Sequence, residues 1–221
     1  MAEYRRGPQS ISKQALQRMP LYLNYLRAQN GHKQSISAPA IAADLGLNEV
    51  QVRKDLAAVS SQAGKPKRGF DVAMLMRDIE RFLGYDDVNR AVLAGAGHLG
   101  GALLSYRGFA AYGLEIVAAF DNREELMGKT IGGTQVFPIQ KAPDLCKRLN
   151  AHIGIITVPA AHAQEVCDKL VEGGVLAIWN FASAHLTVPK GILVHHENMA
   201  ASLAALSQHL REQMKKDRGT E

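Results

Sequence analysis

Three glycines near the middle of the chain have the spacing of a dinucleotide-binding loop. Gly95, Gly97 and Gly100 follow the apolar run "AVLA" as G-x-G-x-x-G, and a helical pattern begins after them. In such a loop the first glycine permits a tight turn, the second lets the backbone approach a pyrophosphate, and the third allows a helix to pack closely on a strand. Amides at the start of that helix then bind the phosphates. The motif alone is a weak indication of a dinucleotide site, so the assignment depends on the residues around it.

An acidic residue follows where a dinucleotide needs one. The segment 114–121, "LEIVAAFD", is predicted to be a buried strand ending in Asp121, 21 positions after Gly100. A carboxylate there hydrogen-bonds the hydroxyls of the adenosine ribose and repels a 2′-phosphate. The sequence therefore favours NAD over NADP, and Arg123 keeps NADP open as the alternative.

Strands and helices alternate around these motifs. The pattern predicts strands at 134–139, 151–159, 175–183 and 191–198, and helices at 142–149 and 160–174. Such alternation indicates an α/β fold with a doubly wound, parallel sheet of the Rossmann type and right-handed crossovers. Ligands bind beyond the carboxyl ends of these strands. We therefore expect the nicotinamide half of a dinucleotide at two turns, made by Thr157, Val158, Pro159, Asn180, Phe181 and Ala182.

Positive charge is concentrated in the first third of the chain. Residues 1–70 contain 11 Lys+Arg and 4 Asp+Glu, whereas residues 71–221 contain 15 Lys+Arg and 17 Asp+Glu. The whole net charge of +5 thus comes from the first segment. This asymmetry indicates an anionic partner for that segment alone.

The same segment has the pattern of a helix-turn-helix. After a mostly apolar helix at 18–27, Ser37 is a suitable N-cap for a second helix that Gly46 ends. A third helix begins after Asn48, only a few residues later. Two short helices joined by a tight glycine turn are typical of DNA-binding proteins.

The predicted contacts to DNA are polar and basic. Gln51, Arg53 and Lys54 point outward from the third helix, where Gln and Arg can bind adenine and guanine edges and Lys can neutralise phosphate. The stretch "GKPKRGFDV" then predicts a β-hairpin wing on the DNA backbone or in a minor groove. Its basic residues are Lys65, Lys67 and Arg68. The plainer alternative is a solvated basic surface on a small helical domain.

Two further helices are expected outside these motifs. Residues 74–87 have the pattern of a linking helix. Near the C-terminus, apolar residues recur at three- to four-residue spacing, which fits a helix packed on its own sheet or one docked onto another subunit. They are Met199, Leu203, Leu206, Leu210 and Met214.

Catalysis is not expected. No Ser/His/Asp array and no metal-ligand spacing is visible, and no segment is left over for a substrate domain. We interpret the histidines in the loop and the last strand as structural, and Cys146 and Cys167 as ordinary core residues. No apolar run reaches the roughly 18 residues that span a membrane, and the N-terminus has no secretory pattern. A cytoplasmic protein is therefore expected.

A DNA-binding segment joined to a dinucleotide-binding segment indicates a sensor. The chain resembles the Rex family of NADH-responsive transcriptional repressors in "RMPLYLNYLR", "VQVRKDL", the "GFDV" wing exit, "GAGHLG", "SYRGF", "EIVAAFD", "TVPA" and "NFA". These motifs run in family order over nearly the whole chain. The resemblance implies NADH and NAD⁺ as ligands, an inverted-repeat operator in double-stranded DNA, and release of that operator when NADH binds. It also implies a homodimer that exchanges its C-terminal helices.

The resemblance also assigns residues and domains. It implies a winged-helix domain with its linker helix over 1–84, a Rossmann NAD(H)-binding domain over 85–198 and an exchanged helix over 199–221. Asp121 and the neighbouring Asn122 would bind the ribose, and Tyr106 would lie near the nicotinamide. The loop residues implied for the pyrophosphate are Gly95, Ala96, Gly97, His98, Leu99 and Gly100.

The chain departs from the family at a few positions. His98 replaces the usual Asn, and Ala200 and Ala201 stand where the family has an Asp and a large apolar residue. That Asp is thought to act in the redox latch, pairing with the tyrosine or with a DNA-domain arginine, here Arg18. The alternatives kept open are a dinucleotide-binding repressor without redox discrimination, an NAD(H)-dependent dehydrogenase, and a CoA- or nucleotide-binding scaffold.

Overall fold

The chain folds into two compact units. The computed structural model describes residues 11–62, 64, 69–87 and 89–218, and the units divide between Asp87 and Val88 rather than after residue 84. Within the described ranges, no helix is long and apolar enough to cross a membrane.

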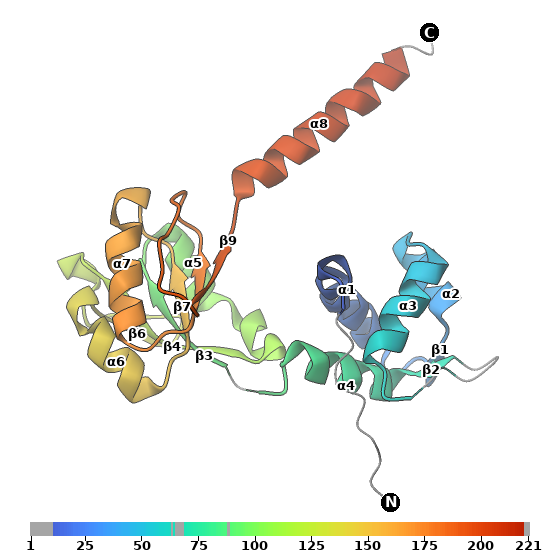
Figure 1. Cartoon of the computed structure of the whole chain (residues 1–221), viewed down its shortest axis with the longest axis horizontal. Coiled ribbons are helices and arrows are strands. Elements are labelled where there is room, and N and C mark those ends of the chain that lie inside the picture. Colours follow the sequence, from blue (N-terminus) through green and yellow to red (C-terminus); the bar gives the residue numbers. More distant parts are fainter. Residues whose placement is uncertain (1–10, 63, 65–68, 88, 219–221) are drawn as a thin grey trace, which may run out of the picture. The chain divides into compact units, whose positions relative to one another are not determined.

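The described part of the first unit contains four helices and a short strand pair (Figure 1). The helices are α1 (Lys13–Gln29), α2 (Ala38–Leu45), α3 (Glu49–Val59) and α4 (Val72–Leu83). Each begins after a side chain that accepts a hydrogen bond from a backbone N–H of the first turn, as N-caps do. These caps are Ser12, Ser37, Asn48 and Asp71. The predicted caps of α2 and α3 are confirmed.

Two helix boundaries differ from the prediction. The first helix begins at Lys13, and Pro20 lies inside it. The last helix of the unit begins after its cap Asp71 and ends at Gly84, which has a φ of +70°. Glycine adopts this left-handed conformation without steric cost and so ends the helix before residue 87.

This last helix, α4, belongs to the core of the first unit. Leu75 and Ile79 are buried in one cluster with Met19 and Leu23 of α1 and Leu56 of α3. The segment expected to be a linker is thus a structural part of the helical unit.

A short strand pair closes the first unit. β1 (Ser35–Ile36) pairs antiparallel with β2 (Phe70–Asp71). Gly69 precedes β2 with a φ of +73°, and a Cβ there would come within 2.1 Å of the Ile36 carbonyl oxygen. The strand β2 directly follows the segment predicted to be a wing, whose basic residues Lys65, Lys67 and Arg68 lie outside the described residues.

The second unit contains the predicted doubly wound sheet (Figure 1). Its strand order is β5-β6-β4-β3-β7-β8-β9. The strands are β3 (Asn89–Ala94), β4 (Leu114–Asp121), β5 (Thr130–Ile131), β6 (Thr134–Pro138), β7 (Ile153–Ile156), β8 (Ala177–Asn180) and β9 (Leu193–His196). All neighbours pair in parallel except β5, which runs antiparallel to β6. The unpredicted β5 is joined to β6 by Gly132 and Gly133, both with positive φ, as tight hairpins require.

Helices cover both faces of this sheet (Figure 1). They are α5 (His98–Ser105), α6 (Ala142–Leu149) and α7 (Ala160–Glu172), with 3-10 turns η1 (Arg107–Tyr112), η2 (Glu124–Leu126) and η3 (Ile139–Lys141). Val92 and Ala94 of β3 pack in the cluster that contains α6 and α7, whereas Leu93 packs with Leu104 of α5. Alternate residues of a strand face opposite sides, so the central strand is buried on both.

The two cysteines are core residues, as expected. Cys146 lies on α6 and Cys167 on α7, and both are buried in the same cluster. Burial raises the pKa of each thiol to about 11. The thiols are therefore neutral near pH 7 and poor nucleophiles.

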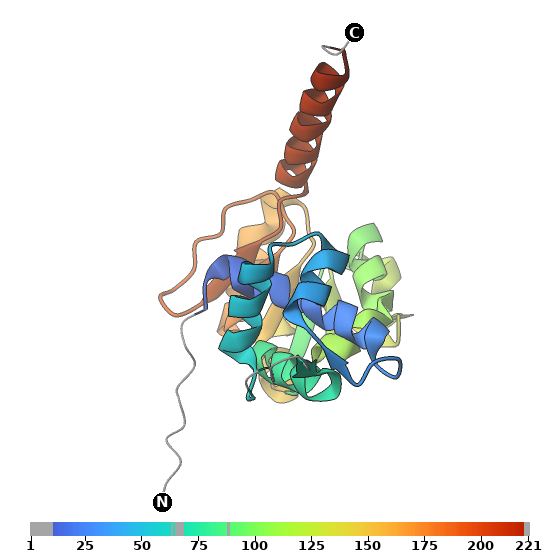
Figure 2. The same ribbon diagram turned by 90° about the vertical axis from the view of Figure 1, so that its right-hand side faces the viewer.

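The C-terminal helix does not pack on the sheet of its own unit. α8 (Met199–Arg218) is one continuous helix (Figure 2), and every described side chain from Met199 to Lys215 is exposed. This excludes the first of the two alternatives raised for the terminal helix. Its five large apolar side chains are each at least 50% exposed.

Candidate functional site

The glycine motif lies where the strand order reverses. β3 is flanked by β4 on one side and β7 on the other, so the chain leaves the sheet centre in both directions. Ligands of doubly wound sheets bind in the crevice beyond the strand ends at this point. The segments that follow β3, β4 and β7 therefore form the candidate site.

The three glycines do what their spacing predicts. A Cβ on Gly95, whose φ is +101°, would lie 2.8 Å from the carbonyl carbon of Thr157. A Cβ on Gly100 would lie 1.9 Å from the Gly95 oxygen. Gly97 meets nothing closer than the Arg123 Nη2, at 3.6 Å. The first and third glycines thus allow close packing, and the second is next to the end of the Arg123 side chain.

The start of α5 faces this loop. The helix begins at His98, directly after Gly97, and no side chain caps it. Backbone N–H groups of its first turn are therefore available to an anion. Thr157 supports the loop from β7, because its hydroxyl donates to the Gly95 oxygen at 2.7 Å.

Asp121 is fixed beside the loop at the end of β4. Its Oδ2 accepts the Ala96 N–H at 2.8 Å, and its Oδ1 accepts the Arg123 backbone N–H at 2.9 Å. The Arg123 side chain adds Nε to Oδ1 at 3.1 Å and Nη2 to Oδ2 at 3.2 Å. Burial raises the pKa of Asp121, but the hydrogen bonds from Arg123 and Ala96 outweigh it and lower the pKa below the usual value. The carboxylate is therefore ionised at neutral pH.

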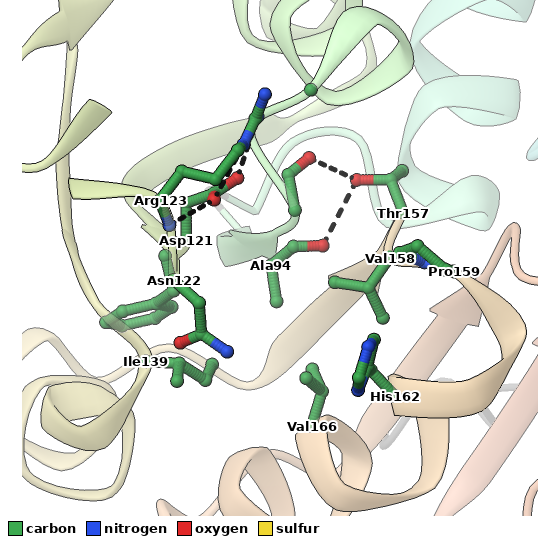
Figure 3. Close-up of a pocket in the computed structure, with 13 residues that line it drawn as sticks. Ala94, Asp121, Asn122, Arg123, Ile139, Thr157, Val158, Pro159, His162 and Val166 are labelled. Carbon is green, nitrogen blue, oxygen red and sulfur yellow. Dashed lines mark hydrogen bonds and ion pairs between the residues drawn. The ribbon is translucent and has the colours of Figure 1, made fainter. Parts of the chain in front are cut away.

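A cavity of about 480 Å³ opens next to Asp121, which is large enough for a nucleoside. Figure 3 shows Asp121 and Arg123 on one side of it and Val158 and His162 on the other. The lining residues are Ala94, Gly95, Gly97, Phe120, Asp121, Asn122, Arg123, Ile139, Thr157, Val158, Pro159, His162 and Val166. Apolar walls and a polar rim suit an adenine base and its ribose.

Seven of the residues expected to bind a dinucleotide line this cavity. They are Gly95, Gly97, Asp121, Asn122, Thr157, Val158 and Pro159. Ala96 and Gly100 belong to the same loop. The Ala96 N–H donates to Asp121, and Gly100 lies close to the Gly95 oxygen. His98 and Leu99 are exposed at the start of α5.

Of the residues expected near the nicotinamide, Thr157, Val158 and Pro159 line this cavity, whereas Tyr106, Asn180, Phe181 and Ala182 are not among its lining residues. Asn180 is fully buried, and its amide nitrogen donates to the Ala182 and Ala184 oxygens at 3.1 and 3.0 Å. Its own Oδ1 accepts the Ala182 N–H at 3.0 Å. Asn180 thus shapes the turn after β8 from inside.

Tyr106 and Phe181 belong to one row of aromatic rings. Tyr106 contacts Phe109 edge-on with centroids 5.0 Å apart, Phe109 contacts Trp179 at 6.0 Å, and Trp179 contacts Phe181 at 4.9 Å. Tyr106, at one end of the row, is 54% exposed. The row thus connects two of the residues expected near the nicotinamide, Tyr106 and Phe181.

Several residues that line the cavity were not predicted from the sequence. Phe120 precedes Asp121 on β4, Ile139 comes from η3, and His162 and Val166 come from α7. The last two are four residues apart in the helix after the "TVP" turn, a spacing that places them on one face. That spacing could have indicated them, whereas Ile139 carries no local signal.

Three of the six predicted DNA-binding residues lie on α3, and the other three, Lys65, Lys67 and Arg68, lie outside the described residues. Gln51, Arg53 and Lys54 are all exposed. Gln51 donates from Nε2 to Asp55 Oδ1 at 2.7 Å, and Arg53 pairs with Glu49 one turn earlier. The helix therefore presents a polar, basic face that internal contacts already orient.

Asp55 links this helix to α1. Its Oδ2 accepts from Arg18 Nε at 2.7 Å and from the Tyr22 hydroxyl at 2.8 Å. Burial raises the pKa of Asp55, but its three side-chain donors outweigh burial and lower it. Burial, with help from Asp55, raises the pKa of Tyr22 to about 12. In this structure Arg18 of α1 is thus bonded to Asp55 of α3, within its own unit.

Known proteins match both units. The model of a "CoA binding domain" matches residues 86–184, and that of a "putative DNA-binding protein N-terminus" matches residues 10–57. The redox-sensing transcriptional repressor Rex of Treponema denticola is 39% identical, over 87% of this chain and 91% of that protein. The protein of the same name from Brevibacillus brevis is 34% identical, over 91% and 98%.

Solved structures agree over the full length. The crystal structure of RSP with β-NAD⁺ and operator DNA matches with a TM-score of 0.85 and 29% identity, covering 96% of this chain and 98% of that one. The complex of RSP with β-NADH matches with a TM-score of 0.83 and 28% identity, covering 95% and 99%. RSP is described as a Rex-family repressor. Because both the helical unit and the dinucleotide fold align with such repressors along nearly the whole chain, this chain belongs to the Rex family of redox-sensing transcriptional repressors.

Proposed function

We propose that this protein is a transcriptional repressor that binds an inverted-repeat operator and releases it when NADH binds. One observation carries the proposal: a helix-turn-helix unit and a dinucleotide cavity occur in one chain, which matches RSP bound to β-NAD⁺ and operator DNA over 96% of its length. The relatives are repressors, which argues against the dehydrogenase alternative. Operator DNA lies in the cytoplasm of a bacterium, so we place the protein there.

The geometry supports a definite position for NADH or NAD⁺. The pyrophosphate would lie over the loop from Gly95 to Gly100, the adenosine in the cavity, and its ribose next to Asp121. The nicotinamide would extend toward the turns after β7 and β8 and toward Tyr106.

Redox discrimination would depend on the charge of the nicotinamide ring. NAD⁺ carries a positive charge on that ring and NADH does not, and moving a charge out of water costs free energy. An apolar surface near the ring therefore favours NADH. A tenfold preference corresponds to about 1.4 kcal/mol, whereas a shift from 1:99 to 99:1 needs about 5.5 kcal/mol. Two sites in a dimer would share that requirement.

A second copy of the chain would supply the second of those sites. We propose that the exposed apolar stripe of α8 packs against the partner subunit, because five large apolar side chains along 16 residues are each at least 50% exposed. A dimer would also place two α3 helices on the two half-sites of a palindrome. The basic wing residues Lys65, Lys67 and Arg68 would add contacts to the backbone or the minor groove.

The deciding experiment is a fluorescence-anisotropy titration of a labelled inverted-repeat duplex, with NADH and NAD⁺ compared at saturation. We expect NADH to weaken operator binding and NAD⁺ to preserve it. Equal affinity with both would contradict redox sensing and leave a dinucleotide-binding repressor. Steady loss of NADH absorbance with an aldehyde or 2-hydroxy-acid couple would instead favour a dehydrogenase.

A further inference from the structure

The ribose carboxylate of this site is already saturated. An ionised carboxylate has about four lone-pair positions, and Asp121 receives four donors from the chain itself. These are the Ala96 N–H, the Arg123 backbone N–H, and Arg123 Nε and Nη2, all within 3.2 Å. A ribose diol can bind this carboxylate only by sharing or displacing the guanidinium.

The bound guanidinium also cancels the charge that would repel a 2′-phosphate. Asp121 is 8% exposed and Arg123 49% exposed, so the arginine forms the outer layer of the pair. The rejection of 2′-phosphorylated dinucleotides normally depends on an unpaired carboxylate at this position. Here an approaching phosphate meets a neutral ion pair with its cationic member outermost.

The guanidinium of Arg123 lies next to the phosphate loop. Its Nη2 is the nearest atom to a Cβ built on Gly97, at 3.6 Å, and Figure 3 shows the side chain extending past Asp121 at the rim of the cavity. Arginine has five N–H donors in a planar fork that suits phosphate oxygens, and two of them bind Asp121. The pairing with Asp121 therefore leaves three N–H groups of the guanidinium for a further acceptor.

We infer that Arg123 allows this site to bind 2′-phosphorylated dinucleotides, NADPH and NADP⁺, in addition to NADH and NAD⁺. The inference rests on the proposed function, because it takes the cavity next to Asp121 as the adenosine site. On binding NADPH, Arg123 compensates the negative charge of Asp121 and donates its remaining N–H groups to the 2′-phosphate. NADH has an uncharged 2′-hydroxyl in place of the 2′-phosphate, and this small group hydrogen-bonds to the same ion pair.

The test compares the affinities of NADH and NADPH for the full-length protein by isothermal titration calorimetry. Wild type, Arg123→Gln and Arg123→Lys are measured, with Arg148→Gln as the matched control. Arg148 is 71% exposed on α6 and pairs with Asp144 one turn away, so its removal takes away one surface charge from the same unit. In Arg123→Gln, Asp121 keeps both of its backbone donors.

We expect wild type to bind both ligands, and Arg123→Gln to raise the ratio of the NADPH to the NADH dissociation constant at least ~tenfold, as one charge-assisted hydrogen bond would. Arg123→Lys should restore part of the loss, and Arg148→Gln should leave the ratio unchanged. Equal weakening of both ligands in Arg123→Gln would assign Arg123 to the shared pyrophosphate and overturn the inference. Binding of NADH without NADPH in wild type would also overturn it and leave the proposed function intact. Failure to bind NADH would overturn both.

Discussion

Gln51 donates a hydrogen bond from Nε2 to Oδ1 of Asp55, one turn later on helix α3, at 2.7 Å. The same carboxylate accepts from Arg18 and Tyr22 of α1. A residue expected to read a base is therefore bonded to the network that holds α3 in the unit. Its side chain is oriented before DNA arrives, which lowers the entropy cost of binding.

The Asp55 network should account for a large part of the stability of the first unit. In Asp55→Asn, the Arg18 charge, 23% exposed, loses its carboxylate, so we expect a loss of about 3 kcal/mol in the free energy of unfolding. Urea unfolding followed by far-UV circular dichroism measures it, because the single tryptophan, Trp179, reports on the second unit. The control is Glu49→Gln, which removes an exposed ion pair from the same helix and should cost less than about 1 kcal/mol. Equal losses of stability in both variants would contradict the stabilising role of the Asp55 network.

The same network should respond to acid. The pKa of Asp55 in the folded protein lies below the usual 3.8, so its stabilising contribution is complete well above that value and is lost as the pH falls through the native pKa. The difference in unfolding free energy between wild type and Asp55→Asn should therefore be large near pH 7 and shrink below about pH 4. Other carboxylates titrate in both proteins and cancel in the difference. A difference that stays constant down to about pH 3 would show that the charge of Asp55 is not what stabilises the unit.

Local signals predicted most of the fold. Ser37, Gly46 and Asn48 mark helix ends by capping and by left-handed geometry, which depend on a few neighbouring residues. The start of α1 was missed because the apolar pattern was followed only from Arg18, whereas the helix tolerates Pro20 in its interior and begins at the cap Ser12.

The site was predicted only in part, for a different physical reason. Gly95, Gly100 and Asp121 occur in a motif with fixed spacing, so the sequence alone places them together. Ile139 and Val166 reach the same cavity from η3 and α7, which only the sheet order brings next to β3. The bidentate pairing of Arg123 with Asp121 likewise depends on a side-chain conformation that spacing does not specify.

Two adjacent glycines provide a direct test of the loop. In Gly100→Ala the new methyl group would lie 1.9 Å from the Gly95 oxygen, so the loop must move. We expect a loss of about 2 kcal/mol or more in stability and weaker NADH binding. In Gly101→Ala the nearest atom is 3.9 Å away, and alanine is favoured over glycine within a helix by roughly 1 kcal/mol. Trp179 fluorescence during unfolding and calorimetric titration with NADH measure both effects. Similar behaviour of the two variants would contradict the close packing of loop and helix.

The proposed dimer depends on the apolar stripe of α8. Leu206 is 66% exposed, and its replacement by Glu would put a charge in the proposed interface. Burying one leucine contributes roughly 1.5–3 kcal/mol, so we expect the dimer to weaken at least about tenfold in analytical ultracentrifugation. Gln208→Glu is the control, because two residues along a helix turn to the opposite side. A Leu206→Glu protein that stays dimeric at the same concentrations would place the interface elsewhere.

The basic face of α3 should bind DNA without contributing to nucleotide binding. Lys54 is exposed, and a lysine that neutralises one phosphate contributes to binding of every sequence. Lys54→Ala should therefore weaken specific and nonspecific duplexes alike and lower the salt dependence by about one counterion. Arg53, which first has to leave Glu49, should instead discriminate between bases, so Arg53→Ala should weaken the operator by about 1–3 kcal/mol more than a scrambled duplex. Anisotropy titrations at several salt concentrations measure both, and calorimetric titration should find the affinity for NADH unchanged. Arg148→Ala is the control, because it removes a similar exposed charge from the other unit. Equal effects of all three variants on DNA binding would show that α3 acts only as a general basic surface.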